Sequence, residues 1–187
     1  MFGFSRTFAN TLSQIGFQNL IINRIDYQEK EKRSEENRLT FYWNPGNNKT
    51  MLTHILEDHY SGYKKVHPNF KWVEINPMKS DFKPTLYFKY FSEQIETSSK
   101  SHKFNLIYLP YGDDFTHSNM RFSFLQMECV MNILQSNPGY KNFSSYHINW
   151  ATSQDYMRDV RLLGDEFKSI FNAKKGASEV ITSALFS

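Results

Sequence analysis

Two adjacent carboxylates, Asp113 and Asp114, follow an apolar run in this sequence and could act as an acid or a base. The run at 104–109 predicts a buried strand, and Gly112 favours a turn directly after it. In α/β architectures with parallel strands, catalytic groups lie where strands end and loops begin. The aspartates are therefore candidates for acid/base chemistry, with the alternative that they cap the next helix.

The apolar periodicity predicts that strands and helices alternate along the chain. Expected strands lie at 20–22, 51–56, 104–109 and 146–148, and expected helices at 5–14, 27–42, 86–98, 120–135 and from 153 onward. Residues 64–85 contain three prolines and show no period, which predicts a long loop. Four repeats of strand and helix predict an α/β fold in which parallel strands are joined by right-handed crossovers.

Polar and aromatic residues also follow the first two expected strands. The candidates at these strand ends are Arg24, Asp26, Tyr27, Asp58, His59, Tyr60 and Tyr63. Carboxylates, an arginine and tyrosines suit a sugar site, in which rings stack on aromatic side chains and hydroxyls bind carboxylates. Neighbouring side chains in extended backbone point in opposite directions, so Asp113 and Asp114 cannot supply both carboxylates of a glycosidase. A second carboxylate could come from Asp26 or Asp58, although each could equally be a helix cap or a loop residue.

Several other functions receive little support from the sequence. A metal site built from His54, Asp58 and His59 is disfavoured because His54 lies inside an apolar strand, where a core histidine is expected. Cys129 falls within a helical pattern and predicts a core residue. There is no glycine-rich phosphate loop and no Gly-x-Ser-x-Gly elbow.

Charge and hydropathy argue against nucleic-acid and membrane functions. The net charge is only +3, with 22 basic and 19 acidic residues that are interleaved, so a nucleic-acid binder is a distant third hypothesis. No stretch approaches the roughly 18 apolar residues of a membrane helix. The compartment is not fixed by these features.

Four motifs occur in the order and spacing found in glycoside hydrolase family 38. They are Phe-Gly-Phe-Ser at 2–5, Arg-Ile-Asp-Tyr-Gln at 24–28, Thr-His at 53–54 with the tyrosines that follow, and Gly-Asp-Asp-Phe at 112–115. The chain therefore resembles part of an α-mannosidase catalytic domain. We expect a partial family domain at 1–170 and an unassigned tail at 171–187.

The resemblance implies a retaining, zinc-dependent hydrolysis of terminal α-mannosyl residues of N-glycans, in an incomplete (β/α) barrel. By this resemblance, Asp114 matches the general acid/base and Asp113 a neighbour that contacts the sugar. Arg24 matches a residue near the nucleophile, and Tyr60 and Tyr63 match the tyrosines that line the sugar pocket. The implied partner is a mannose-containing oligosaccharide, and the implied address is the lysosome or the Golgi.

The chain departs from the family pattern at several points. In the family, the nucleophile and the zinc ligands lie outside the stretch that this chain matches, and Phe4 replaces the usual histidine. A glycosidase without nucleophile or metal cannot run a double displacement. We therefore expect an α-mannosidase fragment that is inactive by itself, with a non-catalytic glycan-binding or vestigial module as the alternative.

Overall fold

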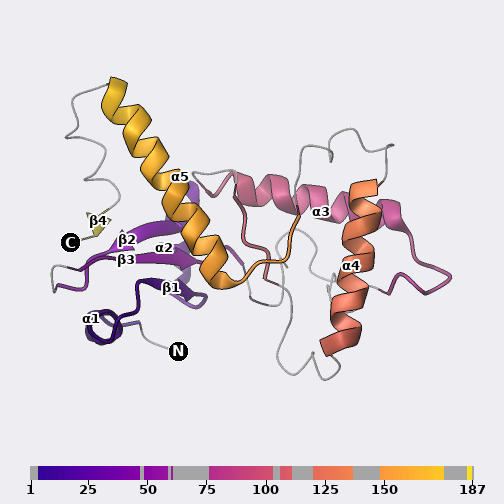
Figure 1. Ribbon diagram of the computed structural model, residues 1–187, viewed down its shortest axis with the longest axis horizontal. Helices are drawn as coiled ribbons and strands as arrows, with labels where there is room; N and C mark the ends of the chain where they lie inside the picture. Colours follow the sequence, from indigo (N-terminus) through magenta and orange to yellow (C-terminus); the bar gives the residue numbers. More distant parts are fainter. Residues whose placement is uncertain are drawn as a thin grey trace. The chain divides into compact units, whose positions relative to one another are not determined.

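The fold is described from a computed structural model of the 187 residues (Figure 1). The structure describes residues 4–46, 49–58, 60, 76–102, 106–110, 120–136, 148–174 and 185–186. The helices are α1 (Arg6–Gln14), α2 (Tyr27–Glu35), α3 (Pro84–Ser99), α4 (Met120–Ser136) and α5 (Ser153–Lys174). The strands are β1 (Asn19–Ile22), β2 (Thr40–Trp43), β3 (Met51–Ile55) and the two-residue β4 (Leu185–Phe186).

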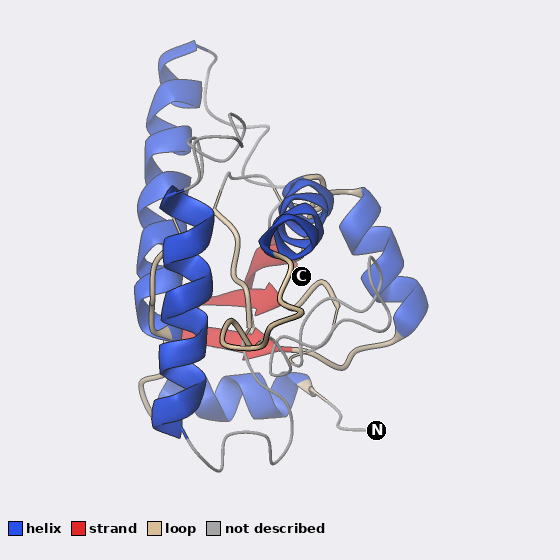
Figure 2. Ribbon diagram, turned by 90° about the vertical axis from the view of Figure 1, so that its right-hand side faces the viewer, coloured by secondary structure: helices blue, strands red, loops and turns tan. Residues whose placement is uncertain are grey.

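Contacts divide the chain into two units. The sheet unit comprises Met1–Glu57, Ser99–Tyr108 and Ala151–Ser187, and the helix unit comprises Asp58–Ser98 and Leu109–Trp150. All described strands belong to the sheet unit and gather in one sheet (Figure 2). Within the helix unit, the rings of Phe124 and Trp150 lie 4.6 Å apart, and Gln135 Nε2 donates to the carbonyl of Ile148 at 3.0 Å.

The sheet has the strand order β1-β3-β2-β4 and mixed orientations. The strands β1 and β3 are parallel, with Ile22 opposite Ile55, which confirms the expected parallel pair. By contrast, β2 runs antiparallel to β3, with Thr40 opposite His54. The α/β class is confirmed, but a sheet of parallel strands alone is wrong for the described residues. The incomplete barrel is not confirmed, because the described strands form one small mixed sheet.

The strand β2 corrects the prediction of a helix over 27–42. The helix α2 ends at Glu35, because Asn37 adopts a left-handed φ of 54°. The amide of Arg38 then donates to the carbonyl of Arg33 at 2.7 Å, and the amide of Asn37 donates to that of Ser34 at 3.2 Å. This pair of bonds is a Schellman motif, which ends a helix. The aromatic and β-branched residues that follow favour a strand.

Two further predicted strands have only part of their length in the described chain. Of the expected strand at 104–109, residues 106–109 are described and form no strand. Of the expected strand at 146–148, only Ile148 is described, and it is not in a strand either. The remaining residues of these two segments lie outside the described part. The helices expected at 5–14, 86–98, 120–135 and from 153 are confirmed with small changes at their ends.

Both faces of the sheet are covered, which explains why all five residues of β3 are buried. One cluster contains the buried residues Ile22, Leu39, Phe41 and Ile55. On that face the guanidinium of Arg33, from α2, lies 4.4 Å from the ring centre of Phe41. The other cluster contains Leu52, Tyr156, Met157 and Val160, so α5 packs against the opposite face. Figure 1 shows α5 lying across the strands.

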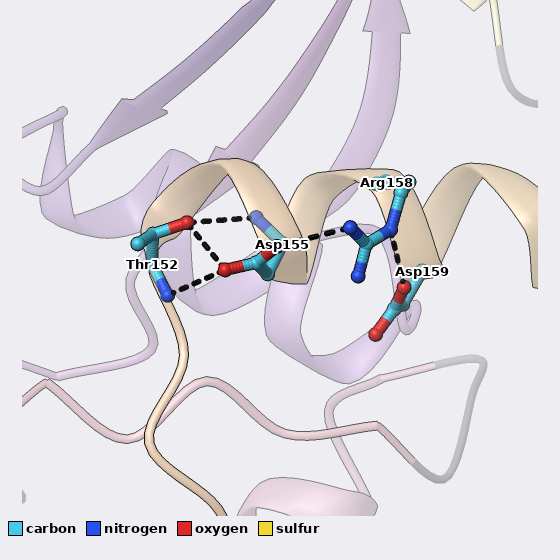
Figure 3. Close-up of polar contacts among 4 residues, drawn as sticks. All are labelled: Thr152, Asp155, Arg158 and Asp159. Atoms are coloured by element: carbon cyan, nitrogen blue, oxygen red, sulfur yellow. Dashed lines mark hydrogen bonds and ion pairs between the residues drawn. The ribbon is translucent and has the colours of Figure 1, made fainter.

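The helix α5 begins at a capping box formed by Thr152 and Asp155 (Figure 3). The amide of Asp155 donates to Thr152 Oγ1 at 3.1 Å, and the amide of Thr152 donates to Asp155 Oδ2 at the same distance. Arg158 then binds Asp155 at 3.0 Å and Asp159 at 3.1 Å. The hydrogen bonds from Thr152 lower the pKa of Asp155, so its ionised form completes the cap.

Candidate functional site at the strand ends

The C-terminal ends of β1 and β3 meet at the same edge of the sheet. The amide of Leu56 donates to the carbonyl of Ile22 at 2.9 Å, which extends the parallel pairing to the last residue of β1. Residues 23–26 therefore leave the sheet beside residues 56–57. This arrangement confirms the expectation that these two strand ends lie together, and it is the edge at which open α/β sheets bind ligands.

Arg24 and Asp26 follow β1 and have different environments. Arg24 is exposed, so its guanidinium is accessible at this edge. Asp26 is the N-cap of α2: its Oδ1 accepts from the amide of Gln28 at 3.0 Å and from that of Glu29 at 3.1 Å. Of the two roles that the sequence left open for Asp26, the structure shows the helix cap.

Glu57 is a buried carboxylate at this edge that the sequence analysis did not single out. Its side chain follows β3 directly and is 6% exposed. Its Oε1 accepts from Ser101 Oγ at 2.9 Å, and Ser101 Oγ lies 2.8 Å from Ser34 Oγ. Its Oε2 has no hydrogen-bond partner among the described residues. The available signal was a carboxylate at the end of the mainly apolar run 51–56, which forms a fully buried strand.

His54 lies in the interior, as predicted for a core histidine. It is 1% exposed, and its Nδ1 lies 2.8 Å from Thr40 Oγ1 and 3.2 Å from the hydroxyl of Tyr156. Its ring stacks on that of His102, which is 9% exposed, at a centroid distance of 5.3 Å. The rings of Tyr156 and Tyr108 contact His54 edge-on at 5.1 and 6.1 Å.

Burial determines the protonation states of His54, His102 and Tyr156. Burial, with a smaller effect from nearby His102, lowers the pKa of His54 from 6.5 to about 3. Burial also lowers the pKa of His102, while the Glu57 carboxylate opposes that shift. Burial raises the pKa of Tyr156 above its usual value of 10. Both imidazoles and the phenol are therefore neutral near neutral pH.

Only some of the remaining predicted site residues lie in the described part of the structure. Asp113, Asp114, Tyr63 and His59 lie outside the described residues. Tyr60 is described, is partly buried and belongs to the helix unit, as does Asp58. The structure therefore brings Arg24 to the strand edge, and the roles of the other candidates stay predictions.

A hollow in the sheet unit lies at the opposite ends of the strands. Its volume is about 380 Å³, and its lining residues are Ser13, Gly16, Phe17, Gln18, Lys49, Thr50 and Arg161. Several of these residues directly precede β1 or β3, so the hollow is not at the edge where Arg24 and Glu57 lie. Arg161 is held there by Asn19 Oδ1 at 2.9 Å.

Comparison with known protein families shows to which family the chain belongs. The model of the glycosyl hydrolases family 38 N-terminal domain matches residues 1–170. The chain belongs to family 38. Family membership agrees with the motifs at 24–28 and 112–115 and with the parallel pair of β1 and β3.

Relatives of this family 38 chain are α-mannosidases by name. Alpha-mannosidase D of Dictyostelium discoideum is 28% identical over 159 residues, covering 83% of this chain and 12% of that protein. The lysosomal alpha-mannosidase of Mus musculus is 25% identical and covers 85% of this chain and 16% of that protein. Alpha-mannosidase 2 of Arabidopsis thaliana is 22% identical and covers 96% of this chain and 17% of that protein. The chain thus spans 12–17% of the length of these relatives.

The described residues of this family 38 chain do not fit a zinc site. Within the described part, no group of three or more His, Cys, Asp or Glu side chains could hold a metal ion. His54 and His102 stack with 18° between their ring planes, so their nitrogens do not converge on a common point. None of the described helices is long and apolar enough to cross a membrane.

Proposed function

We propose that this chain is part of an α-mannosidase and contributes the acid/base side of its sugar site. The family match over residues 1–170 carries the proposal. The parallel ends of β1 and β3 support it, because they bring the exposed Arg24 to the edge where such folds bind ligands. The substrate would be a mannose-containing oligosaccharide, hydrolysed with retention at terminal α-mannosyl residues of N-glycans.

In this proposal each candidate side chain has a role. Asp114 is the general acid/base, and Asp113 is its sugar-contacting neighbour. Arg24 stands near the nucleophile, and Tyr60 and Tyr63 line the sugar pocket. The family domain extends over 1–170 and forms part of an incomplete (β/α) barrel, with 171–187 as a tail.

The second carboxylate of a retaining glycosidase would come from polypeptide outside these residues. A retaining enzyme needs two carboxyl groups about 5 Å apart across the scissile bond. Asp26 is engaged by two backbone amides as a helix cap. The chain spans only 12–17% of its relatives, which leaves ample sequence for the nucleophile and the zinc ligands. The address in the lysosome or the Golgi is proposed on the same family grounds.

A non-catalytic glycan-binding or vestigial module is the second candidate. The observation that favours it is the capping role of Asp26, because this role removes a possible nucleophile from the described sheet edge. Such a module would keep the exposed arginine and the tyrosines as sugar contacts and would hydrolyse nothing.

Activity assays on two proteins test the proposal. We expect the purified 187-residue chain to hydrolyse no aryl α-mannoside, with or without zinc, beyond an Asp114→Asn control. A longer natural product that contains these residues should hydrolyse it and should lose activity on Asp114→Asn. The matched control Asp81→Asn replaces an exposed aspartate and should keep activity.

Each outcome distinguishes the candidates. Turnover by the 187-residue chain would show that the nucleophile lies within it. An active longer product unaffected by Asp114→Asn would mean that the acid is another residue. Binding of a mannose oligosaccharide without hydrolysis by the longer product would favour the non-catalytic module.

A further inference from the structure

The stacked histidines join five separate segments of the sheet unit. The pair itself consists of His54 on β3 and His102, which follows α3. Around it lie Thr40 from β2, Tyr156 from α5 and Tyr108 from the segment 106–110. Because these segments are distant in sequence, the contacts of two imidazoles fix much of the tertiary arrangement of the unit.

The hydrogen-bond partners of His54 are uncharged hydroxyl groups. Its Nδ1 lies within reach of the hydroxyls of Thr40 and Tyr156, at 2.8 and 3.2 Å. A hydroxyl can donate to the lone pair of a neutral imidazole, whereas both nitrogens of a protonated ring are donors. Each hydroxyl can accept as well as donate, but neither supplies the negative charge that a protonated ring would need in this buried place.

Among the described residues, the charged groups near the pair do not compensate two protonated rings. Glu57, which follows β3, is the carboxylate that acts on His102, and its Oε1 already accepts from Ser101. From the other described segments, this region receives the neutral hydroxyls of Thr40, Tyr156 and Ser34 and the phenol of Tyr108. Two cations with ring centres 5.3 Å apart would thus share one carboxylate. A buried charge without a partner is strongly unfavourable.

We propose that His54 and His102 form an acid-sensitive latch, which holds residues 99–102 and α5 against β3 at neutral pH and opens on acidification. This proposal does not rest on the hydrolytic function.

The direction in which pH changes the stability of the latch follows from proton binding. The unfolded chain binds protons at these histidines below about pH 6.5, whereas burial lowers the pKa of His54 in the folded unit to about 3. The unfolded or opened state therefore binds more protons and gains population as the pH falls through this window. Stability from the neutral pair is fully present above about pH 6.5 and is lost progressively below it.

Hydrogen exchange measured by mass spectrometry tests the latch on the full chain. After correction for intrinsic exchange rates, peptides that cover β3 and residues 99–102 should lose protection between about pH 6.5 and about pH 5.5, by up to about fivefold for each histidine. The helix α4, in the other unit, serves as the internal reference and should change less.

Variants separate the latch from general acid sensitivity. His102→Gln removes one titrating ring, so its acid response over that pH unit should be smaller than that of the unaltered chain. Lys100→Gln replaces an exposed neighbour and should keep the full response. His54→Gln provides a second test if His102→Gln does not fold.

Imidazole nitrogen shifts on the unaltered chain provide a test that needs no variant. We expect the ring of His54 to remain neutral in the folded chain at about pH 5.5. Unchanged protection of β3 on acidification, an equal response in His102→Gln, or protonation of both rings without loss of protection would overturn the proposal.

Discussion

Asp114 should behave as an acid in one step of the proposed reaction and as a base in the next. A group with that double role must be protonated before attack and ionised before the glycosyl intermediate is hydrolysed. The first step depends on the basicity of the leaving group, whereas the second step needs only base assistance to water. Removing the carboxyl group therefore has unequal effects on different substrates.

We expect Asp114→Ala, in the longer active product, to slow substrates with poor leaving groups far more than activated aryl mannosides. The loss for poor leaving groups should be on the order of 10²–10⁴-fold, the usual contribution of a positioned acid. The measurement compares kcat/KM for both substrate types. An equal loss for both types, or the same asymmetry in Asp113→Ala, would assign the role to another residue.

Residues at the strand edge show how far residue types alone can be interpreted. Asp26 and Glu57 are both carboxylates that follow a strand. The first caps α2, and the second is buried against Ser101. Both positions were visible in the sequence, and the cap at Asp26 is a local contact with the helix that follows it. The environment of Glu57 depends instead on Ser101, which is distant in sequence and reaches the edge through the fold.

At the scale of elements, Asn37 separates α2 from β2 and so permits the antiparallel pair with β3. Glycine and asparagine tolerate a left-handed φ of 54°, whereas most other residues disfavour it. We expect Asn37→Ala to lower the free energy of unfolding by about 1 kcal/mol, and Asn37→Gly to leave it unchanged or slightly higher. Chemical denaturation measures both.

The control for Asn37 is a nearby exposed helical position. Glu35→Ala changes a side chain of α2 where the backbone is helical, so its effect should be within about 0.5 kcal/mol. Equal losses for Asn37→Ala and Asn37→Gly would contradict the explanation from backbone geometry.

The capping box of α5 gives a second prediction for an element. Thr152→Ala removes the oxygen that accepts from the amide of Asp155 and should lower the free energy of unfolding by about 1 kcal/mol. Gln154→Ala, an exposed position one residue before Asp155, should have little effect. Because hydrogen bonds from Thr152 lower the pKa of Asp155, the contribution of this cap should fade as the pH drops below 3.8.

At the scale of the whole molecule, the sheet edge at β1 invites association. Within the described part of the chain, β1 pairs with β3 alone, and the preceding side chains Ile15 and Phe17 are 67% and 56% exposed. Edge strands beside apolar surface are typical sites of self-association. We expect the isolated chain to associate in sedimentation experiments.

Charge at this edge should reduce the association. Phe17→Lys places a charged residue beside β1, and edge strands commonly carry lysine for that reason. Met78→Lys is the matched control, because Met78 is 85% exposed but belongs to the helix unit. A monomer at all concentrations, or an equal effect of both variants, would contradict a role for the β1 edge.

The sequence by itself determined the local elements and the family. Periodicity located α1, α3, α4, α5, β1 and β3, because an amphipathic repeat depends on neighbouring residues in the chain. The motifs at 24–28 and 112–115 indicated the family, which the match over residues 1–170 confirms. The alternation of Leu39, Phe41 and Trp43 was also present, but the charged helix before it obscured the start of β2.

Only the tertiary structure decided the orientation of β2, the cap at Asp26 and the burial of Glu57 beside Ser101. It also stacked His54 on His102, which lies 48 residues later in the chain. Apart from the cap at Asp26, which is a local contact with the amides of Gln28 and Glu29, these features depend on contacts between segments that are distant in sequence. Such contacts are set by which faces must be buried together, and no local pattern records which distant side chain will occupy a given place.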